Sequence, residues 1–197
     1  YFFIHGGGLA VENALKIAFD WKRYINEQSG IIINGNDLEI ISFEDAFHGI
    51  TGYTLSLSVN PVKVSHFPKF NWPKFEAPSM RFPLNEKNIH ELKIKESKVL
   101  NDIEEYIKKR GKKYIAGIII ELVQGGGADK HFGENFIRGL RNLADKYEIL
   151  LILDEVQTGF GVTGKLWCYE HFKVSPDLLT FGKKAQISGV CINKSIP

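Results

Sequence analysis

The chain has 197 residues, 44% of them hydrophobic, and a formal net charge of +2. This length and composition suit a single domain with a sizeable core, and the near-neutral charge gives no electrostatic case for a nucleic acid or an anionic membrane as partner. The apolar runs are too short to span a bilayer. The two cysteines fit a reducing compartment, so we expect a cytoplasmic protein.

The first part of the chain predicts two strands and one helix. Apolar residues at helical spacing, among them Val11, Leu15 and Ala18, predict a helix that follows a glycine-rich turn. Turn residues then precede a second apolar run and a loop. The predicted elements are a strand at 1–5, a turn at 6–8, a helix at 9–27, a strand at 38–43 and a loop at 45–49.

The remainder of the chain alternates strands with helices. Residues 60–83 contain five of the seven prolines and many aromatic residues, so we expect a long ordered excursion there, because such side chains are costly to leave in water. After it we expect helices at 85–110 and 133–147, and strands at 114–123, 149–154 and 178–181. This alternation predicts an α/β fold with a mostly parallel sheet flanked by helices.

Groups capable of chemistry follow the predicted strands. In parallel sheets, ligands gather at the carboxyl ends of the strands, where this chain has the segments 6–8, 47–48, 121–124, 154–157 and Lys183. Gly6–Gly8 precede a helix, so the N–H groups of Gly7 and Gly8 could bind a phosphate. The same glycines are equally compatible with a simple connection between a strand and a helix.

Three further residues each have two interpretations. Phe47 could stack on a flat ring or belong to the core. His48 could line the same pocket or cap a turn. Glu121 follows three isoleucines, and a carboxylate in such a strand needs a partner unless it marks the exit of the strand to solvent.

Asp154 and Lys183 form the most informative pair. Asp154 ends one apolar strand, and Lys183 follows the next. A pyridoxal-phosphate enzyme requires these two groups: the carboxylate keeps the pyridine nitrogen protonated, and the lysine forms the Schiff base with the cofactor and then moves the proton. Taken singly, Lys183 and Lys184 would both be surface lysines, so the prediction depends on the whole constellation.

Five stretches carry a resemblance to a known family. They are GGGLAVENALKIAFDWK, AFHGITGYTLSLS, FPKFNWPKFEAP, ILDEVQTGFGVTGKLW and PDLLTFGKK. Together they resemble the class-III pyridoxal-phosphate-dependent aminotransferases over nearly the whole chain, and the proline-rich stretch resembles the branch that acts on the terminal amine of lysine. The resemblance implies the large domain of the aspartate aminotransferase-like fold.

The resemblance also implies roles for particular residues. Lys183 would be the Schiff-base lysine, with Lys184 as the alternative. Asp154 would pair with the pyridine nitrogen, supported by Glu121, and Gln157 would bind the phenolic oxygen of the cofactor. Val156 and Phe47 would contact its two faces, and Gly7 and Gly8 its phosphate. The substrates would be an amino acid and a 2-oxo acid, here lysine and 2-oxoglutarate; no metal is implied.

Two positions depart from the family pattern. Ile50 occupies the place of an arginine that grips a substrate carboxylate, and Gly126 that of a glutamate that gates a second arginine. A related ω-aminotransferase for 4-aminobutyrate or ornithine therefore stays open. Family members are also about twice as long and form homodimers, so we expect residues 1–197 to be a partial large domain without the N-terminal segment and small C-terminal domain, inactive alone. A truncated, non-catalytic remnant is the remaining alternative.

Overall fold

The computed structural model describes residues 1–58 and 61–196 and contains a seven-stranded sheet. The strand order is β1-β9-β8-β7-β4-β2-β3. Neighbouring strands from β8 to β3 run parallel, whereas β9 is antiparallel to both β8 and β1. The strands are β1 (Phe2–Ile4), β2 (Glu39–Phe43), β3 (Lys74–Phe75), β4 (Ile115–Glu121), β7 (Leu150–Glu155), β8 (Leu178–Phe181) and β9 (Ser188–Ile192); β5 (Val123–Gln124) and β6 (Lys130–His131) form a separate pair.

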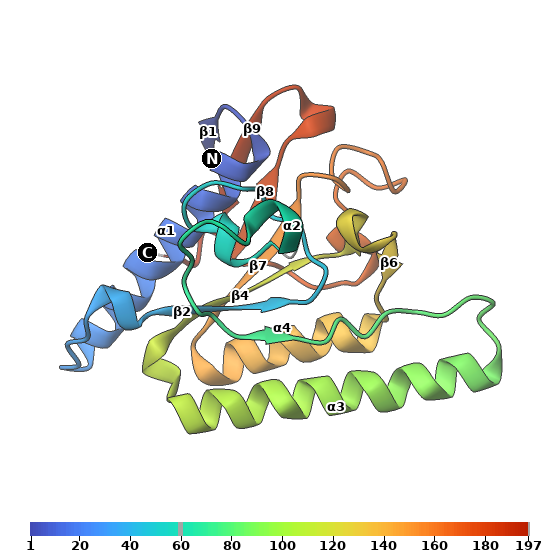
Figure 1. Ribbon diagram of the computed structural model, residues 1–197, viewed down its shortest axis with the longest axis horizontal. Coiled ribbons are helices and arrows are strands. Elements are labelled where there is room, and N and C mark those ends of the chain that lie inside the picture. Colours follow the sequence, from blue (N-terminus) through green and yellow to red (C-terminus); the bar gives the residue numbers. More distant parts are fainter. Residues whose placement is uncertain (59–60, 197) are drawn as a thin grey trace.

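Helices cover the two faces of this sheet (Figure 1). One face carries α1 (Gly7–Gln28). The other carries α4 (Glu134–Tyr147), with α3 (Glu86–Arg110) packed beside it. A short helix, α2 (Pro61–Val64), precedes β3. The result is a three-layer α/β arrangement.

The central strands are apolar on both sides because both faces of the sheet are covered. Side chains alternate along a strand, so Ile118 and Ile120 of β4 join the cluster formed with α3 and α4, while Ile119 joins the cluster formed with α1. All three are fully buried. This packing fixes the positions of the carboxyl ends of β4 and β7, from which the candidate site is built.

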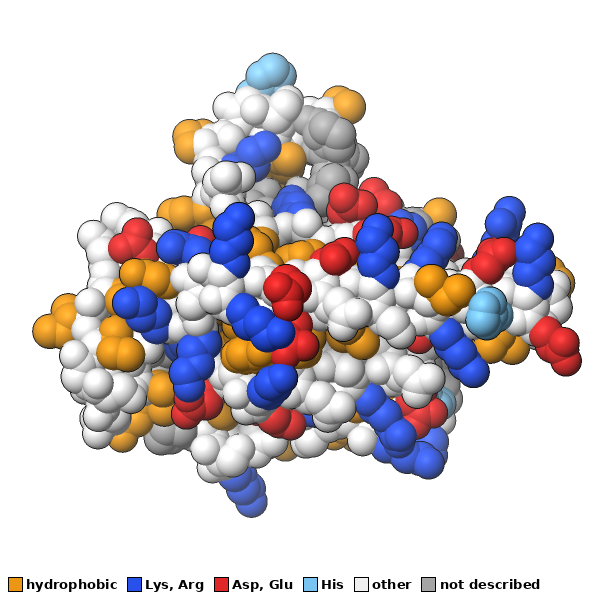
Figure 2. Space-filling view, turned by 90° about the horizontal axis from the view of Figure 1, so that it is seen from below, with side chains coloured by type: hydrophobic (Ala, Val, Ile, Leu, Met, Phe, Trp, Pro, Cys, Tyr) orange, Lys and Arg blue, Asp and Glu red, His pale blue; other side chains and the backbone are white. Residues whose placement is uncertain are grey.

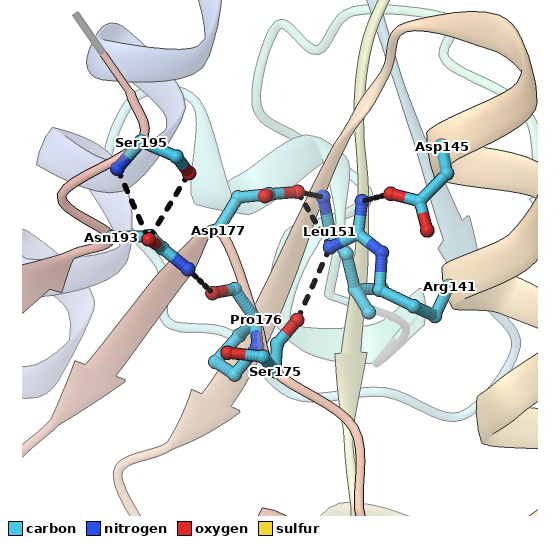
Figure 3. Close-up of polar contacts among 8 residues, drawn as sticks. All are labelled: Arg141, Asp145, Leu151, Ser175, Pro176, Asp177, Asn193 and Ser195. Atoms are coloured by element: carbon cyan, nitrogen blue, oxygen red, sulfur yellow. Dashed lines mark hydrogen bonds and ion pairs between the residues drawn. The ribbon is translucent and has the colours of Figure 1, made fainter.

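A polar cluster lies at the amino ends of the strands, on the side of the sheet opposite the candidate site (Figure 3). Asp177, just before β8, accepts hydrogen bonds through Oδ2 from the Leu151 N–H of β7 at 2.7 Å and from Nη1 of Arg141 of α4 at 2.8 Å. Arg141 also pairs with Asp145, one turn further along α4. This cluster therefore connects two strands and one helix at the edge far from the candidate site.

The principal predicted elements are confirmed, and their boundaries shift by a few residues. The helix expected at 9–27 begins two residues earlier, so Gly7 and Gly8 form its first turn and do not belong to the preceding connection. The strand expected at 114–123 ends at Glu121. The excursion at 60–83 is ordered in its described part and contains α2 and β3, while residue 60 lies outside the described residues. Strand β9 was not predicted.

Charges of both signs are interspersed over the face that α3 presents (Figure 2). Lys108 of this helix, for example, lies 3.0 Å from Glu105 and 3.7 Å from Glu104. Interspersed charges of this kind are typical of a solvated helix face. Across residues 1–58 and 61–196, no helix is both long enough and apolar enough to cross a membrane.

Candidate active site

A cavity of about 190 Å³ lies at the carboxyl ends of β4 and β7, beside the start of α1. The structure brings all nine predicted site residues to its wall, although they come from five segments of the sequence. They are Gly7, Gly8, Phe47, His48, Glu121, Asp154, Val156, Gln157 and Lys183. Val11, Gly49 and Gly126 complete the lining.

The first turn of α1 presents backbone N–H groups to this cavity. The first intrahelical bond runs from the Ala10 N–H to the Gly6 carbonyl at 3.0 Å, so the N–H groups of Gly7 and Gly8 precede the helical ladder and have no partner within it. The first turn contains no acidic residue. A Cβ on Gly7 would lie 2.7 Å from Cγ1 of Val156, which leaves room for glycine only. This turn therefore offers positive N–H groups to an anion.

Asp154 is held by three donors at the floor of the cavity. Its Oδ1 accepts hydrogen bonds from the Val156 N–H at 3.1 Å and from the Thr180 hydroxyl at 3.0 Å, and its Oδ2 lies 2.7 Å from Nδ1 of His48. Asp154 is only 4% exposed. Thr180 was not singled out from the sequence, although a hydroxyl inside the apolar strand Leu178–Phe181 was the available signal.

His48 lines the cavity and contacts Asp154, which decides between its two predicted interpretations. Burial lowers the pKa of His48, but the hydrogen bond and charge of Asp154, together with the charge of Glu121, outweigh this effect and raise the pKa. The imidazole thus faces the Asp154 carboxylate at hydrogen-bond distance inside a buried part of the cavity. The other ring nitrogen, Nε2, is buried without a hydrogen-bond partner among the described residues.

Glu121 holds the loop that carries Phe47. Its Oε1 accepts the Phe47 N–H at 2.8 Å, and the residue is 5% exposed. Burial raises the pKa of Glu121, an effect that His48 and the N–H groups of Phe47 and Gly125 partly offset. We expected Glu121 to support Asp154 from behind the cofactor contacts. The two residues are register partners on adjacent strands, and the hydrogen bonds to Asp154 come from Thr180, His48 and Val156.

Phe47 and Lys183 both reach the open side of the cavity. Phe47 is 47% exposed, which rules out its interpretation as a core residue. Lys183 lies in a 3-10 turn after β8 and Gly182, with a positive φ of 44°, and its ammonium donates a hydrogen bond to Oε1 of Gln157. Lys184 is exposed and lies outside the group of described residues that line the cavity.

Comparison with known proteins fixes the family. The family model described as "Aminotransferase class-III" matches residues 1–196. The chain belongs to the class-III aminotransferases. In sequence it is 43% identical over 196 residues to the L-lysine-epsilon aminotransferase of Mycobacterium tuberculosis, and 35% identical over 205 aligned residues to the mitochondrial 4-aminobutyrate aminotransferase of Homo sapiens. These alignments cover 99% and 93% of this chain.

The fold agrees with that of solved class-III aminotransferases. The lysine aminotransferase from M. tuberculosis in its internal aldimine form matches with a TM-score of 0.90 at 43% identity, over 99% of this chain and 44% of that one. An (S)-enantioselective omega-transaminase from Thermomicrobium roseum matches with a TM-score of 0.82 at 30% identity, over 99% and 42%. The chain also spans only 42% of the length of the M. tuberculosis lysine enzyme and 40% of that of the human enzyme.

The cavity has the donor set that pyridoxal phosphate requires. The N–H groups at the start of α1, which have no partner within the helix, suit a phosphate. The carboxylate of Asp154 suits a protonated pyridine nitrogen, and the amine of Lys183 suits an aldehyde. The absence of Cβ atoms at Gly7 and Gly8 leaves the approach to the backbone open. The residues therefore fit the cofactor that the family is known to use.

Proposed function

We propose that this chain is the cofactor-binding part of a pyridoxal-phosphate-dependent enzyme that moves the terminal amino group of L-lysine to 2-oxoglutarate, giving 2-aminoadipate semialdehyde and glutamate. The main observation in support of this proposal is that Asp154, Lys183 and the first turn of α1 surround one cavity. The 43% identity to lysine-epsilon aminotransferases over 99% of the chain supports the choice of substrate.

Each residue of the cavity has a task in this proposal. Pyridoxal phosphate, when bound, supplies an electron sink for the bond that is broken at the substrate carbon. Asp154 keeps a proton on the pyridine nitrogen, and its contacts with His48 and Thr180 hold the carboxylate in one orientation. Gly7 and Gly8 donate their N–H groups to the phosphate. Phe47 and Val156 confine the ring between them, which restricts its orientation.

Lys183 serves as covalent anchor and as acid–base catalyst. Its amine would hold the cofactor covalently and, once free, would act as the base that takes a proton from the substrate carbon. Gln157 accepts a hydrogen bond from the Lys183 ammonium. This single hydrogen bond keeps the amine beside the cavity, where it can be exchanged for a contact with the substrate.

The first experiment locates the covalent anchor in the full-length protein. Borohydride reduction followed by peptide mapping is expected to place a pyridoxyl label on Lys183. The variant Lys183→Ala should lose both the label and the visible absorption of the bound cofactor, whereas Lys184→Ala, one residue away, should keep both. A label on Lys184 would reassign the lysine, and a wild-type protein without label would contradict the cofactor proposal.

A related ω-aminotransferase is the second candidate. It is favoured by Ile50 and Gly126, which stand where the family carries an arginine and a glutamate on the substrate side, and by the 35% identity to the human 4-aminobutyrate enzyme. Glutamate formation from 2-oxoglutarate, measured with lysine, ornithine and 4-aminobutyrate in parallel, separates the candidates. The fastest donor at equal concentration identifies the substrate.

We also propose that the whole protein is a homodimer and that this chain corresponds to most of its large domain. Leu9 and Ile50, each next in sequence to a glycine of the cavity wall, are 40% and 60% exposed. Exposed apolar side chains beside a site are typical of a covered interface. Sedimentation of the full-length protein should therefore give twice the mass of one chain.

A further inference from the structure

The Phe47 loop, residues 45–49, is held by the hydroxyl of Ser58, a residue with no role in the proposed reaction. Ser58 is 2% exposed, and its Oγ accepts the backbone N–H of His48 at 3.0 Å and donates to the Gly49 carbonyl at 2.7 Å. One side chain thus satisfies two neighbouring peptide groups of the loop. It lies at the end of AFHGITGYTLSLS, nine or ten residues after its two partners.

The loop conformation that Ser58 holds is an unusual one. Gly49 has a φ of +112°, which residues with a Cβ rarely adopt. In this conformation the backbone of Gly49 lies against that of Gly8, because a Cβ on Gly49 would be only 2.8 Å from the Gly8 Cα. Ser58 therefore keeps the Phe47 loop against the first turn of α1.

The far side of this segment is anchored to the same helix. Glu12 of α1 accepts hydrogen bonds through Oε2 from the Thr51 hydroxyl at 2.6 Å and the Tyr53 N–H at 3.0 Å. Residues 51 and 53 are thereby bound to α1, and Ser58, at the end of the same segment, is hydrogen-bonded to the Phe47 loop. Ser58 thus joins the phosphate-facing turn and the Phe47 loop into one unit.

We propose that Ser58 is a positioning residue: it keeps the first turn of α1, which faces the phosphate, in a fixed position relative to Phe47 and His48. Without its hydroxyl, the His48 N–H and the Gly49 carbonyl would both be left without this partner in a buried place. The loop would then relax away from α1, and Phe47 and His48 would lose their alignment with Asp154. This inference rests on the proposed cofactor function of the same cavity.

The test compares two buried serines of one segment in the full-length protein. Ser58→Ala should raise the dissociation constant of pyridoxal phosphate by about tenfold, because the loss of a buried hydrogen-bond partner of this kind is worth about 1–3 kcal/mol. It should also diminish the visible circular dichroism of the bound cofactor, which reports how asymmetrically the ring is held. Ser58→Thr, which retains the hydroxyl, should restore both.

Ser56→Ala is the matched control. Ser56 is 3% exposed, and its hydroxyl accepts the Phe70 N–H at 2.9 Å, away from the Phe47 loop. This variant should keep the wild-type dissociation constant and dichroism at saturating cofactor. If Ser58→Ala behaved like Ser56→Ala while Lys183→Ala still abolished the pyridoxyl label, the positioning role would be wrong and the proposed function would stand. If wild type bound no cofactor, the proposed function would fail first.

Discussion

At the scale of single residues, the state of Asp154 decides whether the cavity can perform transamination. Its two oxygens accept hydrogen bonds from Thr180 and Val156 and face the imidazole of His48. The charge of the carboxylate, and not merely its hydrogen bonds, is what stabilises a protonated pyridine nitrogen. A neutral amide of the same size should therefore preserve the shape of the site and remove its function.

The first prediction tests this charge. Asp154→Asn in the full-length protein is expected to lower kcat/KM by at least about a thousandfold, or about 4 kcal/mol of barrier, while pyridoxal phosphate still binds. Thr180→Val removes one donor and keeps the carboxylate, so it should cost about tenfold or less. Steady-state kinetics and cofactor titration check both variants. Near-normal turnover of Asp154→Asn would refute the role of the carboxylate.

The site residues that could be predicted are those whose type is unusual for their place in the sequence. A carboxylate after an apolar strand, as at Asp154 and Glu121, signals a buried partner. Ser58 and Thr180 gave weaker signals because hydroxyl residues are common in strands and loops. The contact of Glu121 with the Phe47 loop depends on how β4 and the loop lie in space, which no spacing in the sequence reveals.

At the scale of elements, long amphipathic helices and apolar strands were predictable, whereas the short strand β9 was not. Helix α3 is preceded by Asn85, whose side chain accepts the Asn88 N–H at 2.9 Å, and is followed by Gly111 with φ +96°, so both ends are marked by residue type. Strand β9 follows a turn at Lys183–Ala185 and is formed by pairing with β8 and β1. Its short sequence, SGVCI, has no clear alternation of its own.

The second prediction concerns the cluster that ties β7 and β8 to α4. Asp177→Ala is expected to destabilise the protein by about 2–4 kcal/mol, because it deprives the buried Leu151 N–H and the Arg141 guanidinium of a shared acceptor. Asp145→Ala is the control: it removes the other acid that pairs with Arg141, but Asp145 is 66% exposed, so the loss should be below about 1 kcal/mol.

Urea unfolding of the full-length variants measures this difference. Because the cluster lies at the amino-terminal edge of the sheet, the folded fraction of Asp177→Ala should keep the wild-type KM. Equal stability of the two variants would show that Asp177 is not a structural tie.

At the scale of the whole molecule, the residues predicted to bind the cofactor line one cavity, whereas two positions predicted to select the substrate depart from the family pattern. Glu121, Asp154, Gly7 and Gly8 lie at the ends of β4 and β7 and the start of α1. Ile50 and Gly126 belong to the surrounding loops, where substitution alters selectivity at small cost to the fold. The chain spans less than half the length of its relatives, so the full-length protein is the proper object of any activity test.

The third prediction concerns variants that return the family residues to positions 50 and 126, first at position 50 and then at both. Ile50 is 60% exposed within this chain, so an arginine there displaces no other side chain of the same chain. Ile50→Arg should raise kcat/KM for lysine by about tenfold, since a charge-assisted hydrogen bond to a carboxylate is worth about 1.5–3 kcal/mol.

The second altered position, Gly126, has less room. A Cβ on Gly126 would lie 3.0 Å from the Phe47 Cβ, so Gly126→Glu must shift Phe47 slightly. The variant Gly126→Ala measures that steric cost alone. Added to Ile50→Arg, Gly126→Glu should therefore gain less than the arginine did. An unchanged kcat/KM for lysine in Ile50→Arg, with a parent enzyme that is fast on another ω-amine, would overturn the lysine assignment and leave the aminotransferase family unaffected.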